Sequence, residues 1–215
     1  MTAMMMPYAS NTGTKRNLDA LRRAGWALLL TPQNSKRRDA FRFAIDNGAW
    51  SSFTLGKEFD DAAFLKVVEA EGSWADWVVL PDIVAGGLSS LKLSLSWIPR
   101  LHDLRLLLLP LQDGMERSDI EPVLAKHKRL GLFLGGTTDW KLKTMYDWGI
   151  LACAARRHYH VARVNTARRI RLAAEAGADS FDGTSATKYS VTLPLLEAAR
   201  QQPSLLIPSH LPWPL

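Results

Sequence analysis

The chain has 215 residues, of which 47% are hydrophobic and 22% charged, and its formal net charge is +6. These totals fit one globular domain with a sizeable core and argue against a disordered chain. No apolar stretch is long enough to span a bilayer, and the opening MTAMMMPYAS lacks the basic segment and apolar core of a secretion signal, so we expect a cytoplasmic protein with no membrane partner.

The basic balance is a modest hint of a polyanionic partner, and a solvated surface with extra lysine and arginine explains it equally well. The single cysteine, Cys153, has no partner for an internal disulfide and cannot build a zinc site alone. We therefore expect it to pack a helix. We expect no metal and no other cofactor.

Short apolar runs alternate with amphipathic stretches along the chain, a pattern typical of β/α units. Ser118 is expected to cap one of the helices, and Asn165 another. Proline-rich residues 203–215 are predicted to form an irregular tail. The predicted strands lie near residues 3–8, 26–31, 41–46, 76–81, 105–111, 131–134, 158–164 and 180–182, and the predicted helices near 17–23, 60–72, 89–101, 118–131, 140–156, 166–177 and 192–201.

About eight β/α units are what a closed (β/α)8 barrel of the TIM type requires. We predict a compact α/β barrel over residues 1–202 as a single domain, without a zinc-binding subdomain. An open doubly wound sheet is the alternative. No GxGxxG follows the first strand and no P-loop occurs in the chain, so the barrel is favoured.

Four polar residues come at or just after the ends of predicted strands: Asp46, Asp82, Gln112 and Asp182. In a parallel barrel the carboxyl ends of the strands meet at one rim, where barrel enzymes hold their catalytic groups. We therefore expect these four side chains to face one cavity and to grip a substrate by hydrogen bonds.

Two of these residues form a candidate pair of catalytic carboxylates. Asp182 could attack an electrophilic sugar carbon or remove a proton, while Asp46 handles protons. Asp182 could instead cap a helix or bind loop backbone. Gly48 would turn the chain and place Trp50 over the pocket, where the indole stacks on a flat heterocycle or packs in the core.

The remaining candidates concern binding of a planar base. Asp82 and Gln112 suit the edge of such a base, or they cap a turn and bind a loop. Gly135 and Gly136 would offer backbone N–H groups to a ligand carbonyl, or form a plain turn.

Basic residues after strand ends are expected to hold phosphates beside the site. His158 and His160 share one face of a strand but have no further ligands at suitable spacing, so they are interpreted as packing or surface histidines. The candidate phosphate contacts are Lys36, Arg37, Arg38 and Lys188.

Six segments, in order along most of the chain, resemble the tRNA-guanine transglycosylase family, and most closely its small phage-type members that insert 7-deazaguanines into DNA. The segments are MPYASNTGTK, DNGAW, LPDIV, PLQDG, LGGTTD and SFDGTSATK. Four departures accompany the likeness. The family's zinc site of three cysteines and a histidine and its RNA-docking segment are missing, GGTTD replaces a longer loop that ends in glutamate, and Arg163 stands where the family has a small residue beside the base.

The resemblance implies a role for each matched position. Asp182 falls on the nucleophile, and Asp46 on the general acid/base. Trp50 falls on the ring that stacks on the base, Asp82 on the group that reads the guanine edge, and Gln112 on the contact to the base carbonyl. The Gly135–Gly136 loop adds a backbone donor, and Lys188 falls on a phosphate-contacting arginine.

The resemblance implies exchange of guanine in a polynucleotide, with DNA favoured over tRNA, for a 7-deazaguanine such as preQ0 or preQ1. It also allows a homodimer and, for a phage-encoded chain, the host cytoplasm. Two alternatives stay open: a hydrolase that releases a deazapurine base from a nucleoside or nucleotide, and a nucleic-acid-binding relative without activity.

Overall fold

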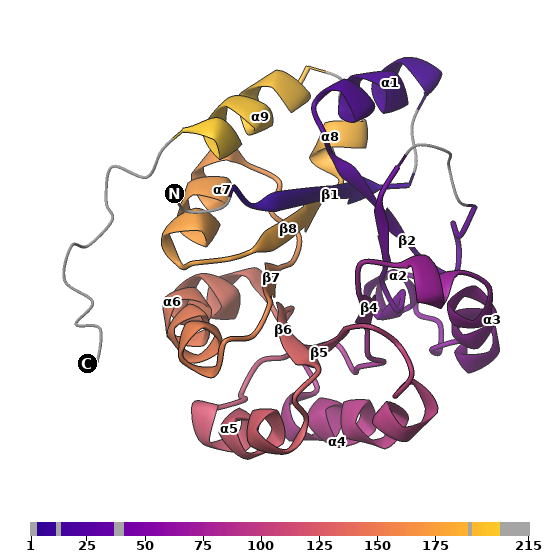
Figure 1. The fold of residues 1–215 in the computed structure, drawn as a ribbon, viewed down its shortest axis with the longest axis vertical. Helices are drawn as coiled ribbons and strands as arrows, with labels where there is room; N and C mark the ends of the chain where they lie inside the picture. The colour runs from indigo at the N-terminus through magenta and orange to yellow at the C-terminus, as the bar shows by residue number, and fades with distance from the viewer. Residues whose placement is uncertain (1–3, 12–13, 37–40, 189–190, 203–215) are drawn as a thin grey trace.

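The computed structural model describes residues 4–11, 14–36, 41–188 and 191–202. Eight parallel strands form a closed barrel in chain order, and helices surround it (Figure 1). The predicted (β/α)8 barrel is therefore confirmed, while the predicted tail of residues 203–215 lies outside the described residues. The strands are β1 (Met6–Ser10), β2 (Ala27–Leu30), β3 (Phe43–Ile45), β4 (Val78–Val79), β5 (Leu107–Leu111), β6 (Leu130–Leu134), β7 (Tyr159–Val161) and β8 (Ser180–Gly183).

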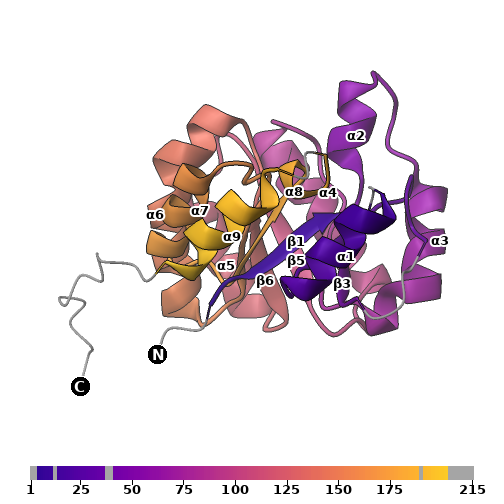
Figure 2. The same ribbon diagram turned by 90° about the horizontal axis from the view of Figure 1, so that it is seen from above.

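Each predicted helix is present, with ends shifted by a few residues. Two short helices, α2 and α8, were not predicted; both lie toward the end of the barrel where α2 projects in Figure 2. The helices are α1 (Lys15–Arg23), α2 (Ala49–Thr54), α3 (Asp61–Glu71), α4 (Gly87–Trp97), α5 (Arg117–Lys126), α6 (Thr138–Ala155), α7 (Ala167–Glu175), α8 (Ser185–Lys188) and α9 (Leu193–Gln201), with short 3-10 turns at Gly72–Trp74 and Ile98–Arg100.

Two predicted helix caps are wrong. Glu116, not Ser118, is the N-cap of α5, where it and Asp119 form a reciprocal capping box. Thr166, not Asn165, caps α7, because its hydroxyl accepts the N–H of Arg169. Asn165 instead binds the start of α8: its Oδ1 accepts from the backbone N–H and the hydroxyl of Ser185, each at 3.1 Å.

The strands divide the apolar side chains into two clusters. A large outer cluster fills the space between the barrel and its helices. A smaller cluster fills the barrel itself, because alternate residues of each strand point inward. Its members are Tyr8, Ala27, Ala44, Trp77, Val79, Leu108, Phe133 and Ala162.

The barrel closes between its first and last strands. Tyr8 pairs with Asp182 across β1 and β8, and His160 pairs with Ser180 across β7 and β8. This register brings the last strand, with its candidate nucleophile, beside His160 of β7 and His158 just before that strand. Among the described residues, no helix is both long and apolar enough to cross a membrane.

Cys153 is exposed on α6, so the expected packing role is wrong. The close packing of this helix depends on Gly149 instead. A Cβ at Gly149 would lie 1.9 Å from the backbone oxygen of Ala176, just after α7. The missing side chain therefore lets the two helices approach.

Gly149→Ala is expected to lower the free energy of unfolding by about 2 kcal/mol, because backbone cannot yield as a flexible side chain can. Urea denaturation measures this loss. Cys153→Ala on the same helix is the control and should change it by less than about 0.5 kcal/mol. If Gly149→Ala leaves the free energy of unfolding unchanged, the two helices can move apart without cost.

Candidate active site

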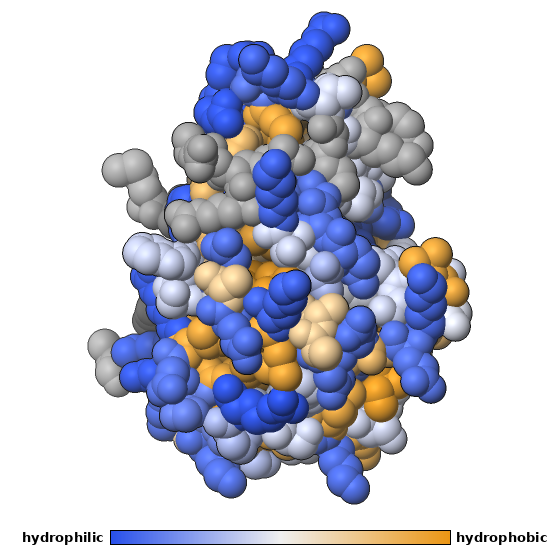
Figure 3. Space-filling model, turned by 90° about the vertical axis from the view of Figure 1, so that its right-hand side faces the viewer, coloured by the Kyte–Doolittle hydropathy of each residue, from blue (hydrophilic) through white to orange (hydrophobic). Residues whose placement is uncertain are grey.

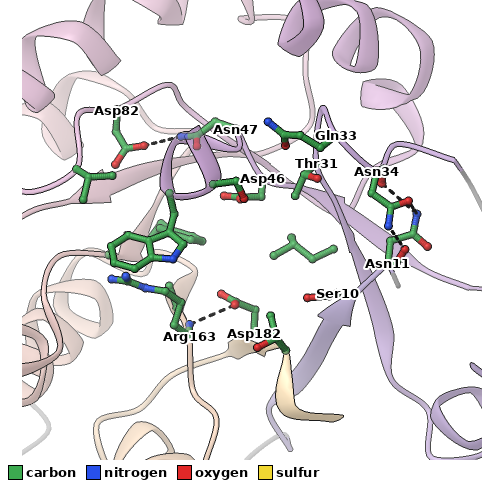
Figure 4. Close-up of a pocket in the computed structure, with 18 of the residues that line it drawn as sticks. Ser10, Asn11, Thr31, Gln33, Asn34, Asp46, Asn47, Asp82, Arg163 and Asp182 are labelled. Carbon is green, nitrogen blue, oxygen red and sulfur yellow. Dashed lines mark hydrogen bonds between the residues drawn. The ribbon is translucent and has the colours of Figure 1, made fainter. Parts of the chain in front are cut away.

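A cavity of about 320 Å³ opens at the carboxyl ends of the strands. Asp46 and Asp182 project into it from β3 and β8, on opposite sides of the space in Figure 4. The other predicted base-site residues line the same cavity, as the strand-end positions led us to expect. They are Trp50, Asp82, Gln112, Gly135, Gly136 and Arg163.

Asp46 follows β3 directly and is largely shielded from solvent. Burial raises its pKa to about 7, and the charges of Asp182 and Asp82 act in the same direction. Backbone N–H groups of Gly48 and Asn47 oppose this rise. Near neutral pH, Asp46 can therefore both give and take a proton, as a general acid/base must.

Asp182 has 8% of its surface exposed, and both of its oxygens are held. Its Oδ2 lies 3.0 Å from Nε2 of His160, and its Oδ1 accepts the backbone N–H of Arg163 at 3.2 Å. The interpretation of the histidines as packing or surface residues missed this contact: His160 is fully buried and also touches the candidate nucleophile.

Asp82 belongs to a buried network of amides. Asn47 Nδ2 donates to its Oδ1 at 2.7 Å, and Gln112 Nε2 donates to its Oδ2 at 2.5 Å. Burial nevertheless raises the pKa of Asp82 to about 6, while these two amides and Arg163 oppose the rise. Asn47, which no sequence pattern marked, also donates to the carbonyl of Leu80 at 2.7 Å and so ties β3 to β4.

The Gly135–Gly136 pair does not offer free backbone donors, so this prediction is wrong. Gly135 N–H donates to Leu111 and Gly136 N–H to Oε1 of Gln112, each at 3.1 Å. A Cβ at Gly135 would lie 2.7 Å from Nε2 of Gln112. The glycines therefore make room for the glutamine and hold its carboxamide, which also accepts the N–H of Ala85 at 3.0 Å.

Gly48 turns the chain as predicted, with a φ of +81°, and begins α2. Trp50 on this helix is 43% exposed and lines the cavity rather than the core. The guanidinium of Arg163 lies over its ring, 3.9 Å from the centroid, and Arg163 Nη2 donates to the carbonyl of Gly136. Arg163 itself has a φ of +56°, a costly conformation typical of functional sites.

The predicted phosphate contacts are placed only in part. Lys36 is exposed and does not line the cavity, although its carbonyl accepts from Asn11 at the rim. Arg37 and Arg38 lie outside the described residues. Lys188 ends α8 beside the site, but its side chain is likewise not described. Figure 3 shows the face on the right-hand side of Figure 1, where hydrophilic residues are mixed with smaller apolar patches.

Lys141 on α6 is a buried charge that no sequence pattern predicted. It is 1% exposed, and its Nζ donates to the carbonyl of Ala162 beside Arg163. Burial lowers its pKa from 10.5 to about 7, Arg163 lowers it further and Asp182 opposes the change. The amine therefore changes charge near neutral pH behind the site.

We expect Lys141→Met to raise the free energy of unfolding by about 2 kcal/mol more at pH 6 than at pH 9. The unfolded chain keeps the ordinary lysine pKa, so between pH 7 and 10.5 the folded wild type binds fewer protons and gains stability as pH rises. Methionine removes this dependence. Urea denaturation at both pH values measures the difference, and Lys143→Met, at an exposed lysine of the same helix, is the control. If Lys141→Met changes the free energy of unfolding equally at both pH values, the pKa of Lys141 is not lowered by burial.

Within the part of the chain that the structure describes, no group of three or more His, Cys, Asp or Glu residues is arranged to hold a metal ion. The arrangement offers acid/base and nucleophilic chemistry from carboxylates instead. Its two-sided layout, with Asp46 facing Asp182, suits attack on one face of a substrate and proton transfer on the other.

No protein-family model and no curated protein sequence matches the chain. It is similar to solved structures of other barrels. These are the aldolase QR15 (16% identity, TM-score 0.55, 90% of this chain and 97% of that one), a 3-hexulose-6-phosphate synthase (14%, 0.51, 91% and 99%) and the dihydropteroate synthase of Yersinia pestis (10%, 0.53, 94% and 95%). At such identities the likeness supports the barrel fold alone.

Proposed function

We propose that the chain is a guanine transglycosylase, which exchanges a guanine in a polynucleotide, with DNA favoured, for a 7-deazaguanine. The observation that carries the proposal is a pair of carboxylates that face one cavity in different settings. Asp182 accepts the backbone N–H of Arg163 and lies 3.0 Å from Nε2 of His160, whereas burial keeps Asp46 partly protonated at neutral pH. Paired carboxyl groups with separated roles are typical of glycosidic bond chemistry.

The exchange then takes two displacements at one carbon. Asp182 attacks C1′, the C1′–O bond forms as the C1′–N9 bond breaks, and Asp46 gives its proton to the departing guanine. The incoming base, such as preQ0 or preQ1, next loses its N9 proton to Asp46 and attacks C1′, which releases Asp182. Two inversions retain the configuration at C1′, and protons balance over the cycle.

Recognition of the base falls to the wall formed by Asp82 and Gln112. An ionised carboxylate has about four acceptor sites. The amides of Asn47 and Gln112 occupy two of those on Asp82, so it keeps capacity for N–H groups of a guanine-like edge. The Oε1 of Gln112 already accepts two backbone N–H groups, and one hydrogen of its Nε2 goes to Asp82, so Gln112 orients Asp82. The second hydrogen of Nε2 can still donate to the base carbonyl.

Trp50 and Arg163 form the entrance of this site. Because the guanidinium covers one face of the indole, a base that stacks on that face must displace Arg163, which is then free to meet a phosphate. The cavity of about 320 Å³ is small among ligand sites. It suits one unstacked nucleotide, so the target base must leave its helix.

The test is incubation of the full chain, purified from cells without their own transglycosylase, with DNA or tRNA and labelled preQ0. Nucleoside mass spectrometry of the polymer gives the readout. Deazaguanine in the polymer, with guanine released one for one, supports the proposal. Base release from a nucleoside without incorporation would instead identify a hydrolase, and binding of the polymer without exchange or release would identify a binding protein; either overturns it.

A further inference from the structure

The interior of the barrel holds a chain of hydrogen bonds that ends on Asp182. His158 Nε2 lies 2.7 Å from the hydroxyl of Ser180, and that hydroxyl lies 2.8 Å from Nδ1 of His160. His160 Nε2 in turn lies 3.0 Å from Oδ2 of Asp182. Asp182 lines the cavity and the other three do not, so the chain reaches the site from within the barrel.

This polar chain lies in aromatic surroundings. The His160 ring is stacked on Phe133, with centroids 4.9 Å apart and planes 8° from parallel, and Trp77 lies 4.7 Å away. Polar groups in such a place are costly unless each is bonded, and both nitrogens of His160 are. Gly131 gives His158 its space, because a Cβ there would lie 2.7 Å from the His158 carbonyl.

The donors and acceptors fit in one direction when Asp182 is ionised. A carboxylate only accepts, so His160 Nε2 must carry the hydrogen. A neutral imidazole has one N–H, so Nδ1 of His160 accepts from the hydroxyl of Ser180. The Ser180 oxygen is then free to accept from Nε2 of His158. Burial lowers the pKa of His160, which favours the neutral ring that this arrangement needs.

We propose that His158, Ser180 and His160 are positioning residues, which lock His160 in its Nε2–H tautomer and thereby hold Asp182 as an oriented, acceptor-only carboxylate. The inference rests on the proposed function, since it assigns Asp182 as the nucleophile. A base oriented by a third group is the usual arrangement behind an activated nucleophile. Here the histidine orients the nucleophile itself, while the Arg163 N–H holds its other oxygen.

Nitrogen NMR of the histidine-labelled full chain reads the tautomer directly. We expect neutral, Nε2-protonated His160 at pH 7 in the wild type, since burial lowers its pKa below 6.5. Ser180 and Asp182 both favour the Nε2–H tautomer, one at each ring nitrogen. In Ser180→Ala only the Asp182 carboxylate is left to favour it, so a fraction of Nδ1-protonated His160 should appear beside the main Nε2-protonated form. The titratable groups that face His160 are Tyr8, His158, Lys141 and Asp182. This substitution replaces none of them, although His158 loses its Ser180 partner.

The same variant should lower kcat/KM for base exchange about tenfold, because Asp182 is held less often by an N–H donor. His160→Gln, which keeps an N–H donor in place of Nε2, should retain at least tenfold more activity than His160→Leu. A merely structural role would not separate these two variants in this way.

Tyr159→Phe is the matched control. It lies on the same strand and removes a buried hydroxyl that donates to the Met145 carbonyl at 2.8 Å, outside the barrel interior. It should lower stability and leave the tautomer and kcat/KM unchanged. An Nδ1-protonated His160 in the wild type, or a single tautomer kept in Ser180→Ala, would overturn the positioning role. If the tautomers behave as expected and no base is exchanged, only the proposed function fails.

Discussion

Asp182→Asn is expected to lower the rate of base exchange by about 10⁴-fold or more, the scale seen when a nucleophile is removed. The amide cannot form the covalent bond to C1′, although its oxygen can still accept the His160 N–H, so the barrel should stay folded. Exchange of radiolabelled guanine measures the rate. Mass spectrometry of the wild type stopped during turnover should detect a nucleotide bound to the peptide that contains Asp182.

Asp139→Asn is the control, because it lies exposed in the first turn of α6 and should leave the rate unchanged. A normal rate in Asp182→Asn would show that another group attacks C1′. A covalent adduct that persists in Asp182→Asn would lead to the same conclusion and would direct attention to Asp46.

The barrel could be predicted because most strands are short apolar runs buried on both faces. Runs such as Leu107–Leu111 and Leu130–Leu134 have no exposed residue, which is typical of parallel strands. Helices α2 and α8 were missed because they have six and four residues, too few for a helical period to show. Their starts depend on local contacts, such as the Asn165 oxygen that holds Ser185.

Most of the cavity could be predicted because the carboxyl ends of parallel strands lie at one rim of a barrel. Asp46, Asp82, Gln112 and Asp182 follow strand ends in the sequence, and all four line the cavity. Their positions in the sequence do not reveal that Gln112 is hydrogen-bonded to Asp82. That pairing joins residues 30 apart and depends on the space that Gly135 leaves.

Residues behind the mouth left no usable signal in the sequence. His160 and Ser180 sit on strands of three and four residues, and only the β7–β8 register brings them together. In the sequence Lys141 resembles any lysine on a helix surface, and only the fold shows that it is buried. Each belongs to a buried polar contact whose partner lies about 20 residues away or more, so a reading of neighbours along the chain cannot find it.

Asp46→Asn is expected to lower the exchange rate by about 10²–10⁴-fold, the usual contribution of a general acid/base. In the wild type, kcat/KM should fall above about pH 7, because Asp46 then loses the proton that the leaving guanine needs. The basic limb of the pH profile should vanish in the variant. A basic limb that persists would assign that proton to another group.

The same substitution should act in the opposite sense on stability. The folded-state pKa of Asp46 is about 7, against 3.8 ordinarily, so between those values the folded chain binds more protons than the unfolded chain. Its free energy of unfolding therefore falls as pH rises through that window. The amide side chain of the variant carries no charge, so Asp46→Asn should be more stable than the wild type at pH 8, with the gain lost near pH 4, as urea denaturation at both values can measure. A variant that loses activity and gains stability indicates that the buried acid serves the chemistry. If Asp46 only holds the loop, Asp46→Asn should lose both activity and stability.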